Sequence, residues 1–187
     1  KELAMVITQF THQKLNSLTI IGSAEGFHAL GLSMLTGLVP SCYESDAELT
    51  KQLSHNAETN SLKIETYPSF EANTFLDRPP GLVLMDIEGD ETSILTEERL
   101  NDWKSHHLII EIHGEEKLDT IIKRSEKIFQ IKFIPCQKRT TKDYPFPIPL
   151  RHLLSRWWKV PVQEWRSDSI GWLILSPQSI GLDKPTD

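Results

Sequence analysis

The chain has 187 residues, of which 39% are apolar and 25% charged, and its formal net charge is −6. This composition excludes an intrinsically disordered chain, and the length suits one domain over residues 1–187. No apolar run approaches the roughly 18 residues of a membrane span, and the first residues lack the order of a secretory signal. We therefore expect a cytoplasmic protein without a membrane span.

The first elements predict a helix, a strand, a glycine-bearing turn and a second helix. Residues 1–16 are expected to form a lead-in helix. Residues 18–21 are a short apolar run that stops at glycine, as a buried parallel strand does. From Gly26 to about residue 38, apolar residues recur at helical spacing, and Gly37 predicts the end of that helix.

The next part of the chain repeats this order. Residues 39–44 are again extended, and Asp46 is a good N-cap for a helix that runs to Asn60. Residues 62–66 predict a third strand. After a connection rich in proline and asparagine, the unbroken apolar run 82–85 predicts a fourth.

The remaining elements complete an alternating pattern. They are a helical connection at 94–103, a strand at 108–110, a helix at 115–127, a strand at 129–134 and a final strand at 170–176. This alternation predicts an α/β fold with a doubly wound, Rossmann-like and mostly parallel sheet, covered by helices on both faces. Residues 17–135 would form the ligand-binding core. The proline-rich segment 136–169 breaks the pattern and is predicted to be an insertion or lid.

Several other residues are predicted to have no role in a site. Cys42 and Cys136 lack metal-ligand spacing and are expected to be buried free thiols. His28, His106 and His107 show no ligand spacing either, and we expect them at the surface or at helix ends.

A glycine turn after the first strand is the first candidate for ligand binding. In an open parallel sheet, ligands bind beyond the carboxyl ends of the strands, at the point where the strand order reverses. Gly22 and Gly26 enclose Ser23, Ala24 and Glu25, and small residues here would let the backbone approach a ligand closely. Taken alone, this turn is explained about equally well as a tight connection without a ligand.

Glu44 is the second candidate, because it lies at the end of the second strand, about twenty residues beyond the turn. An acid at this spacing can accept hydrogen bonds from both hydroxyls of a ribose. Alternatively, Glu44 and Asp46 simply place negative charge at the start of a helix.

Polar groups also follow the fourth and fifth strands, namely Asp86 with Glu88, and Glu111 with His113. Residues two apart in extended chain share a side, so these groups would line one crevice. Glu88, Glu111 and His113 could bind a substrate or a metal ion, although a divalent metal is not expected because no ligand spacing is diagnostic. His113 has the chemistry of a general base, or it could be tied to a carboxylate for structure alone.

The order of these motifs resembles the FkbM-type family of S-adenosylmethionine-dependent methyltransferases. The resemblance rests on Ile21-Gly22-Ser23-Ala24-Glu25-Gly26-Phe27, Tyr43-Glu44, Met85-Asp86-Ile87-Glu88-Gly89-Asp90-Glu91 and Ile110-Glu111-Ile112-His113, and it covers about residues 18–135. It implies a seven-stranded sheet with an antiparallel last strand, and O-methylation of a hydroxyl on a small molecule or sugar. Cofactor-binding residues would be 22–26, with Glu44 holding the ribose and Asp86 beside the reacting centre.

The implied mechanism is a direct displacement in which the protein aligns the substrate oxygen with the methyl group. His113 is the first candidate for the base and Asp86 the second.

A second hypothesis is a binding module of the same fold without catalysis, because Thr19-Ile20-Ile21 occupies the end of strand one, where the family commonly has an acid. An RNA methyltransferase that uses the basic segment 117–159 is a third. We do not expect nucleic acid as a partner, because Asp86-Ile87-Glu88-Gly89 stands where such enzymes have an Asn-Pro-Pro-Tyr-like sequence. The sequence does not fix the oligomeric state.

Overall fold

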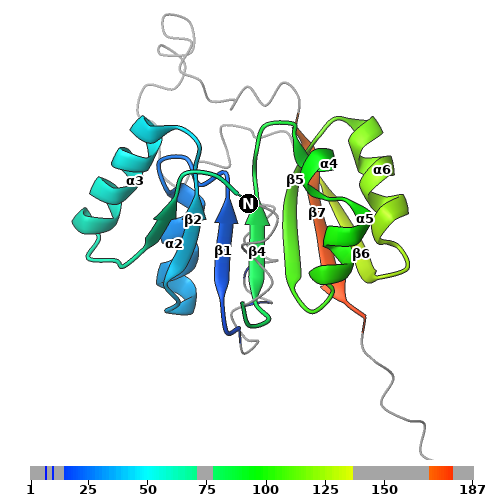
Figure 1. Cartoon of the computed structure of the whole chain (residues 1–187), viewed down its shortest axis with the longest axis horizontal. Helices are drawn as coiled ribbons and strands as arrows, with labels where there is room; N and C mark the ends of the chain where they lie inside the picture. The colour runs from blue at the N-terminus through cyan, green and yellow to red at the C-terminus, as the bar shows by residue number, and fades with distance from the viewer. Residues whose placement is uncertain (1–6, 8–9, 11–14, 71–77, 137–168, 179–187) are drawn as a thin grey trace, which may run out of the picture.

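The structure is a computed structural model that describes residues 7, 10, 15–70, 78–136 and 169–178. Its centre is a seven-stranded sheet of order β3-β2-β1-β4-β5-β7-β6 (Figure 1). The strands are β1 (Leu18–Ile21), β2 (Pro40–Tyr43), β3 (Glu65–Tyr67), β4 (Leu82–Met85), β5 (His107–His113), β6 (Phe129–Pro135) and β7 (Ser169–Pro177). β7 runs antiparallel to both of its neighbours, β5 and β6, and all the other neighbouring strands pair in parallel, so the predicted fold class is confirmed.

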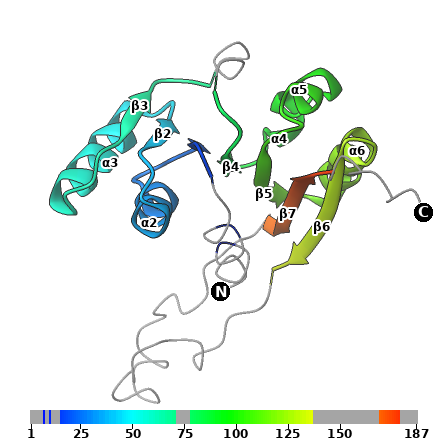
Figure 2. The ribbon, with the colours of Figure 1, turned by 90° about the horizontal axis from the view of Figure 1, so that it is seen from below.

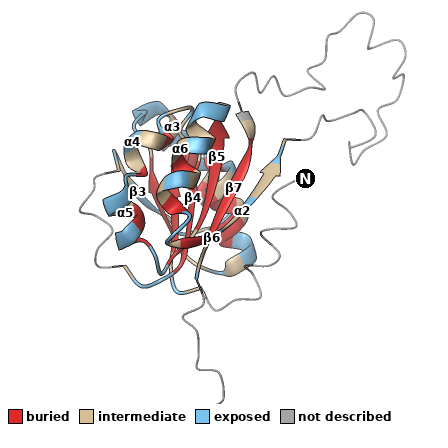
Figure 3. Cartoon of the chain, turned by 90° about the vertical axis from the view of Figure 1, so that its right-hand side faces the viewer, coloured by how far each residue is buried: buried red, intermediate tan, exposed pale blue. Residues whose placement is uncertain are grey.

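The described helices cover both faces of this sheet (Figure 2). They are α2 (Phe27–Thr36), α3 (Ala47–Thr59), α4 (Glu91–Ile94), α5 (Glu97–Asp102) and α6 (Glu115–Ser125). Side chains of α2 and α3 share one apolar core with Leu18 and Ile20 of β1, and a second core on the other side includes Ile21. The central strands are accordingly buried, whereas the outer faces of the helices are exposed (Figure 3). Burial on both sides explains why β1 and β4 are apolar at every position but one.

The register of the central strands brings their carboxyl ends into line. Ile21 of β1 pairs with Tyr43 of β2 on one side and with Met85 of β4 on the other. Met85 in turn pairs with Ile110 of β5. The strand order reverses at β1, between β2 and β4, and this is where an open parallel sheet binds its ligands.

Three local predictions are corrected by the structure. The third strand begins at Glu65 rather than at 62, because the N–H of Leu62 donates to Ala57 O in the turn that ends α3. The single helical connection at 94–103 is two short helices, because Thr96 is extended and its hydroxyl caps the start of α5. Cys136 is half-buried rather than buried, since it follows the edge strand β6.

Two predicted segments lie almost wholly outside the described residues. Of the lead-in helix predicted over 1–16, only Ile7, Phe10, Leu15 and Asn16 are described; the first two are helical and the last two are not, and Phe10 joins the core on the α2 side. Of the insertion at 136–169, only the two end residues are described. The division of the chain into these parts stays a prediction. No helix of the described residues is long and apolar enough to cross a bilayer, and the cytoplasmic location stays a prediction.

Candidate functional site

The glycine loop is shaped by close contact with the neighbouring strands. The N–H groups of Gly22 and Ser23 both donate to Tyr43 O, at 3.0 and 3.1 Å. Gly22 has a φ of 76°, and a Cβ atom there would lie 1.8 Å from the carbonyl oxygen of Asp86. Ala24 is also left-handed, with a φ of 44°. Only glycine therefore fits at position 22, where the loop passes over the end of β4.

Glu44 connects the glycine loop to the second strand. Its Oε2 accepts a hydrogen bond from the N–H of Ala24 at 2.8 Å, and its Oε1 accepts one from Asp46 at 2.9 Å. Asp46 then caps α3 through the N–H groups of Glu48 and Leu49. Glu44 can therefore hold the start of α3 and also bind a ribose, because each carboxylate oxygen has a second lone pair for a ribose hydroxyl.

The loop leads directly into the N-terminus of α2. Gly26 occupies the N-cap position with a φ of 104°, and no side chain caps this helix. The N–H of Gly26 donates to Ser23 O, and the side chain of Asn56 in α3 donates to Glu25 O at 2.9 Å. The first N–H groups of a helix attract anionic groups, so this end of α2 suits a ligand carboxylate.

Asp86 lies beside this loop in a crowded acidic environment. Its backbone N–H donates to Ile21 O at 2.9 Å, which fixes it at the carboxyl edge of β4. The pKa of Asp86 is raised to about 7, first by burial, then by the Glu111 carboxyl, which is hydrogen-bonded to it, and by the Glu88 carboxylate, while His113 lowers it. His28 Nε2 lies 3.9 Å from Asp86 Oδ2. Asp86 therefore changes its charge near neutral pH, where a proton acceptor works best.

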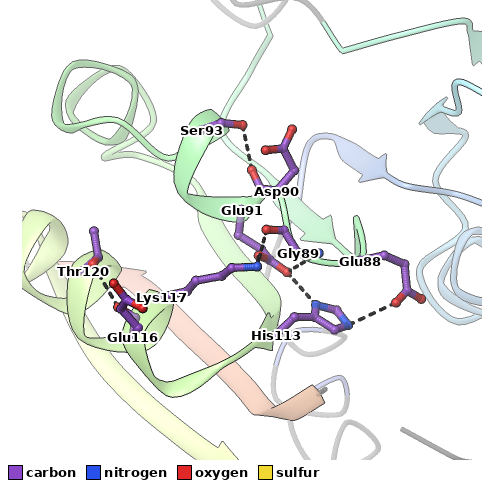
Figure 4. Close-up of polar contacts among 9 residues, drawn as sticks. All are labelled: Glu88, Gly89, Asp90, Glu91, Ser93, His113, Glu116, Lys117 and Thr120. Carbon is purple, nitrogen blue, oxygen red and sulfur yellow. Dashed lines mark hydrogen bonds and ion pairs between the residues drawn. The ribbon is translucent and has the colours of Figure 1, made fainter. Parts of the chain in front are cut away.

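His113 lies at the end of β5 between two carboxylates (Figure 4). Its Nδ1 lies 2.5 Å from Oε1 of Glu91, and its Nε2 lies 3.5 Å from Oε2 of Glu88. The side chain of His113 is 8% exposed, that of Glu91 is 0% exposed and that of Glu88 is 87% exposed. The imidazole thus has one buried acidic neighbour and one that faces solvent.

A candidate metal set lies within the same cluster. Asp86, Glu88 and His113 each offer a ligand atom, and these atoms lie within 4.8 Å of one another. Carboxylate and imidazole ligands suit several divalent metals. The sequence had grouped Glu88 and His113 with Glu111 instead, but the Glu111 carboxyl is hydrogen-bonded to Asp86.

All the residues predicted for the site therefore lie at the carboxyl edge of the sheet. They are Gly22, Ser23, Ala24, Glu25, Gly26, Glu44, Asp86, Glu88, Glu111 and His113. Sequence reasoning missed Glu91, Lys117 and His28. A signal was present for Glu91, which follows Asp86 by five residues and opens α4, and for His28, which lies in the first turn after the glycine loop.

The prediction for His106 is wrong. This residue is 3% exposed and lies directly before β5, at the edge of the sheet opposite the site. Its Nδ1 accepts a hydrogen bond from the N–H of Gly81 at 3.2 Å. Burial lowers the pKa of His106 to about 4, with a smaller contribution from His107. His106 is therefore a buried, neutral hydrogen-bond acceptor in the core.

Solved methyltransferase structures resemble this chain. Precorrin-6Y C5,15-methyltransferase from Geobacter metallireducens matches with a TM-score of 0.64 at 10% identity, over 94% of this chain and 87% of that chain. Ribosomal protein L11 methylase from Lactobacillus delbrueckii subsp. bulgaricus matches at 0.59 and 14%, over 95% and 77%. A methyltransferase from Pyrococcus furiosus matches at 0.58 and 12%, over 95% and 83%.

No protein-family model and no curated protein matches the chain, so membership of the FkbM-type family stays a prediction. Identities of this size establish the fold alone. The strand order and the antiparallel β7, taken with these structures, show that the chain has the Rossmann-like methyltransferase fold.

Proposed function

We propose that this chain is an S-adenosylmethionine-dependent methyltransferase that acts on a hydroxyl of a small molecule or sugar. The observation that carries the proposal is the hydrogen bond from Ala24 N–H to Glu44 Oε2, because it joins the glycine loop to the acid that we expect to hold the ribose. Preformed sites at the point of strand reversal are where doubly wound folds bind their cofactors.

The residues fit the three chemically distinct parts of the cofactor. The uncapped N-terminus of α2 suits the methionine carboxylate, and Glu44 suits the two ribose hydroxyls. The sulfonium carries a positive charge, and Asp86 and Glu111 place acidic groups where the loop meets β4. These two acids could supply the negative charge that Thr19-Ile20-Ile21 lacks at the end of β1.

When bound, the cofactor would supply an electrophilic methyl group. The protein's part would be to exclude water, to align the acceptor oxygen with that methyl and to remove the hydroxyl proton. His113 stays the first candidate for the proton acceptor and Asp86 the second. The choice of a hydroxyl as methyl acceptor rests on the FkbM-type resemblance alone. Two of the similar solved structures are instead named for precorrin and for a ribosomal protein.

A binding module without catalysis is the second candidate, favoured by the apolar end of β1. Titration with S-adenosylhomocysteine tests what both candidates share. We expect saturable binding by calorimetry, and no heat of binding at about 1 mM ligand would overturn both. Turnover of the methyl donor with a library of hydroxyl compounds separates them, because the module would bind and never transfer.

A further inference from the structure

Glu91 is a buried carboxylate with an arrangement that helix formation alone does not explain. It is the first residue of α4 and is 0% exposed, although an acid at this position would normally face solvent. Burial of a carboxylate costs several kcal/mol unless partners compensate for the lost water. Its partners are therefore informative about its role.

Those partners come from three different elements. Glu91 Oε1 lies 2.5 Å from His113 Nδ1 of β5 and 3.1 Å from the N–H of Gly89 in the preceding turn. Its Oε2 lies 3.7 Å from Lys117 Nζ of α6. Lys117 also donates to Gly89 O, so the turn and the carboxylate are held by the same ammonium group.

The turn before α4 explains how two nearby acids face opposite ways. Glu88 and Gly89 both have left-handed backbone, with φ values of 53° and 113°. This reversal leaves Glu88 exposed and directs Glu91 inwards, so that His113 lies between them (Figure 4). The imidazole thus has a different carboxylate at each nitrogen.

The two contacts of His113 are chemically unequal. A distance of 2.5 Å between Glu91 Oε1 and Nδ1 requires a proton between them. Because Glu91 already accepts from Gly89 N–H and faces the ammonium group of Lys117, we assign the carboxylate as acceptor and Nδ1 as donor. In a neutral imidazole, Nε2 is then left with a lone pair. Glu88 at 3.5 Å offers only lone pairs in return, so the hydroxyl of a third group is the natural donor at Nε2.

We propose that Glu91 is a positioning residue that holds the proton on His113 Nδ1 and thereby makes Nε2 the proton acceptor of the site. The catalytic consequence rests on the proposed function: the acceptor oxygen would bond to the methyl carbon as the carbon–sulfur bond of the donor breaks and leaves a neutral thioether, and the hydroxyl proton would move to Nε2. The imidazolium that results is stabilised by the Glu91 carboxylate. Lys117 keeps that carboxylate in place.

The tautomer of His113 tests this proposal without knowledge of the substrate. Long-range ¹H–¹⁵N correlation spectra of the ¹⁵N-histidine-labelled protein, recorded above neutral pH, distinguish a protonated ring nitrogen from an unprotonated one. The His113 signals are assigned by their loss in His113→Asn. We expect a protonated Nδ1 and an unprotonated Nε2, and the reverse pattern in the unaltered protein would overturn the proposal.

Two substitutions of Glu91 isolate its contribution. Glu91→Leu removes the acceptor at similar size, so we expect the proton to distribute over both nitrogens, whereas Glu91→Gln keeps a carbonyl oxygen and should largely restore protonation at Nδ1. The matched control is Glu116→Gln on the exposed face of α6, which should leave the spectrum unchanged. An unchanged tautomer in Glu91→Leu would overturn the proposal, as would a shift of the Nε2 signal typical of metal ligation upon addition of Mg²⁺.

The same samples separate this proposal from the proposed function. Titration with S-adenosylhomocysteine reports on the glycine loop and Glu44, neither of which contacts Glu91 in the described residues. Failure of cofactor binding with the expected tautomer would refute the proposed function alone. Binding with the reversed tautomer would refute the role of Glu91 alone.

Discussion

The carboxylate of Glu44 lies 2.8 Å from the backbone nitrogen of Ala24, so the acid that follows β2 is bonded to the loop that follows β1. Its other oxygen holds the N–H of Asp46 at the start of α3. One side chain therefore fixes both the loop conformation and the entry to the next helix. A ligand that uses Glu44 would meet a loop that is already held by this hydrogen bond, and less ordering of the loop lowers the entropic cost of binding.

Glu44→Gln should weaken S-adenosylhomocysteine binding by about tenfold or more. The amide offers one oxygen where the carboxylate offers two, so its NH₂ group must face either Ala24 N–H or Asp46 N–H. The N–H that loses its acceptor costs about 1–3 kcal/mol. Calorimetry measures the change in Kd. The control is Glu48→Gln on the surface of α3, which should alter the affinity by less than about twofold. Equal weakening in both variants would contradict this role.

Gly22→Ala should abolish cofactor binding and destabilise the fold by several kcal/mol, because the new methyl would lie 1.8 Å from Asp86 O and φ would stay at 76°. Gly31→Ala is the matched control. That position lies within α2, with open space around an added Cβ, so the free energy of unfolding should rise by roughly 0.5–1 kcal/mol. Denaturant titration measures the free energy of unfolding of both variants. An unchanged value for Gly22→Ala would contradict the close contact between Gly22 and Asp86 O.

The sequence predicted the position of the glycine loop and of most polar groups because each of them directly follows an apolar strand. Gly22, Glu44 and Asp86 are found by locating strand ends, and parallel register then brings those ends together. Glu91 could not be found in this way, because its inward orientation depends on the left-handed turn at Glu88 and Gly89.

Burial was equally hard to predict for residues in connections. His106 belongs to a polar stretch before β5, and its sequence context is that of a surface residue. It is covered by the turn at Gly81, which is distant in sequence and whose N–H donates to His106 Nδ1 at 3.2 Å. Long-range packing of this kind leaves no local periodicity in the sequence.

His106 should make folding sensitive to mild acid. Its pKa is lowered to about 4 in the folded chain from an ordinary value of 6.5, so the unfolded chain binds more protons between these values. The stabilisation is complete above about pH 6.5 and is lost as the pH falls towards about 4. His106→Asn does not titrate and keeps an acceptor for Gly81 N–H, so the free energy of unfolding, measured by denaturant titration, should vary less with pH in this range. The control His55→Asn, at an exposed position in α3, should leave that pH dependence unchanged.

Asp86 should have the opposite effect on stability. Its pKa is raised from 3.8 to about 7, so the folded chain binds more protons in this window and stability falls as the pH rises through it. Asp86→Asn should therefore increase the free energy of unfolding by roughly 1–4 kcal/mol near pH 8, with little effect near pH 4. The exposed Asp102→Asn serves as the control. A stability gain that is independent of pH would show that the effect is not electrostatic.

The same carboxyl group should make recognition of the cofactor's positive charge depend on pH. S-adenosylmethionine carries a sulfonium, whereas S-adenosylhomocysteine has a neutral sulfur in the same place. Below about pH 7 Asp86 is largely protonated and distinguishes them weakly, and above this pH its ionised form attracts the sulfonium.

The ratio of the two affinities should accordingly shift several-fold towards S-adenosylmethionine between about pH 6 and about pH 8. Calorimetry in buffers of different ionisation enthalpy should also detect proton release on binding of the sulfonium form alone. Asp86→Asn should remove both effects while leaving the affinity for S-adenosylhomocysteine nearly unchanged. A ratio that does not vary with pH would place the sulfonium away from Asp86, and the methyl group with it.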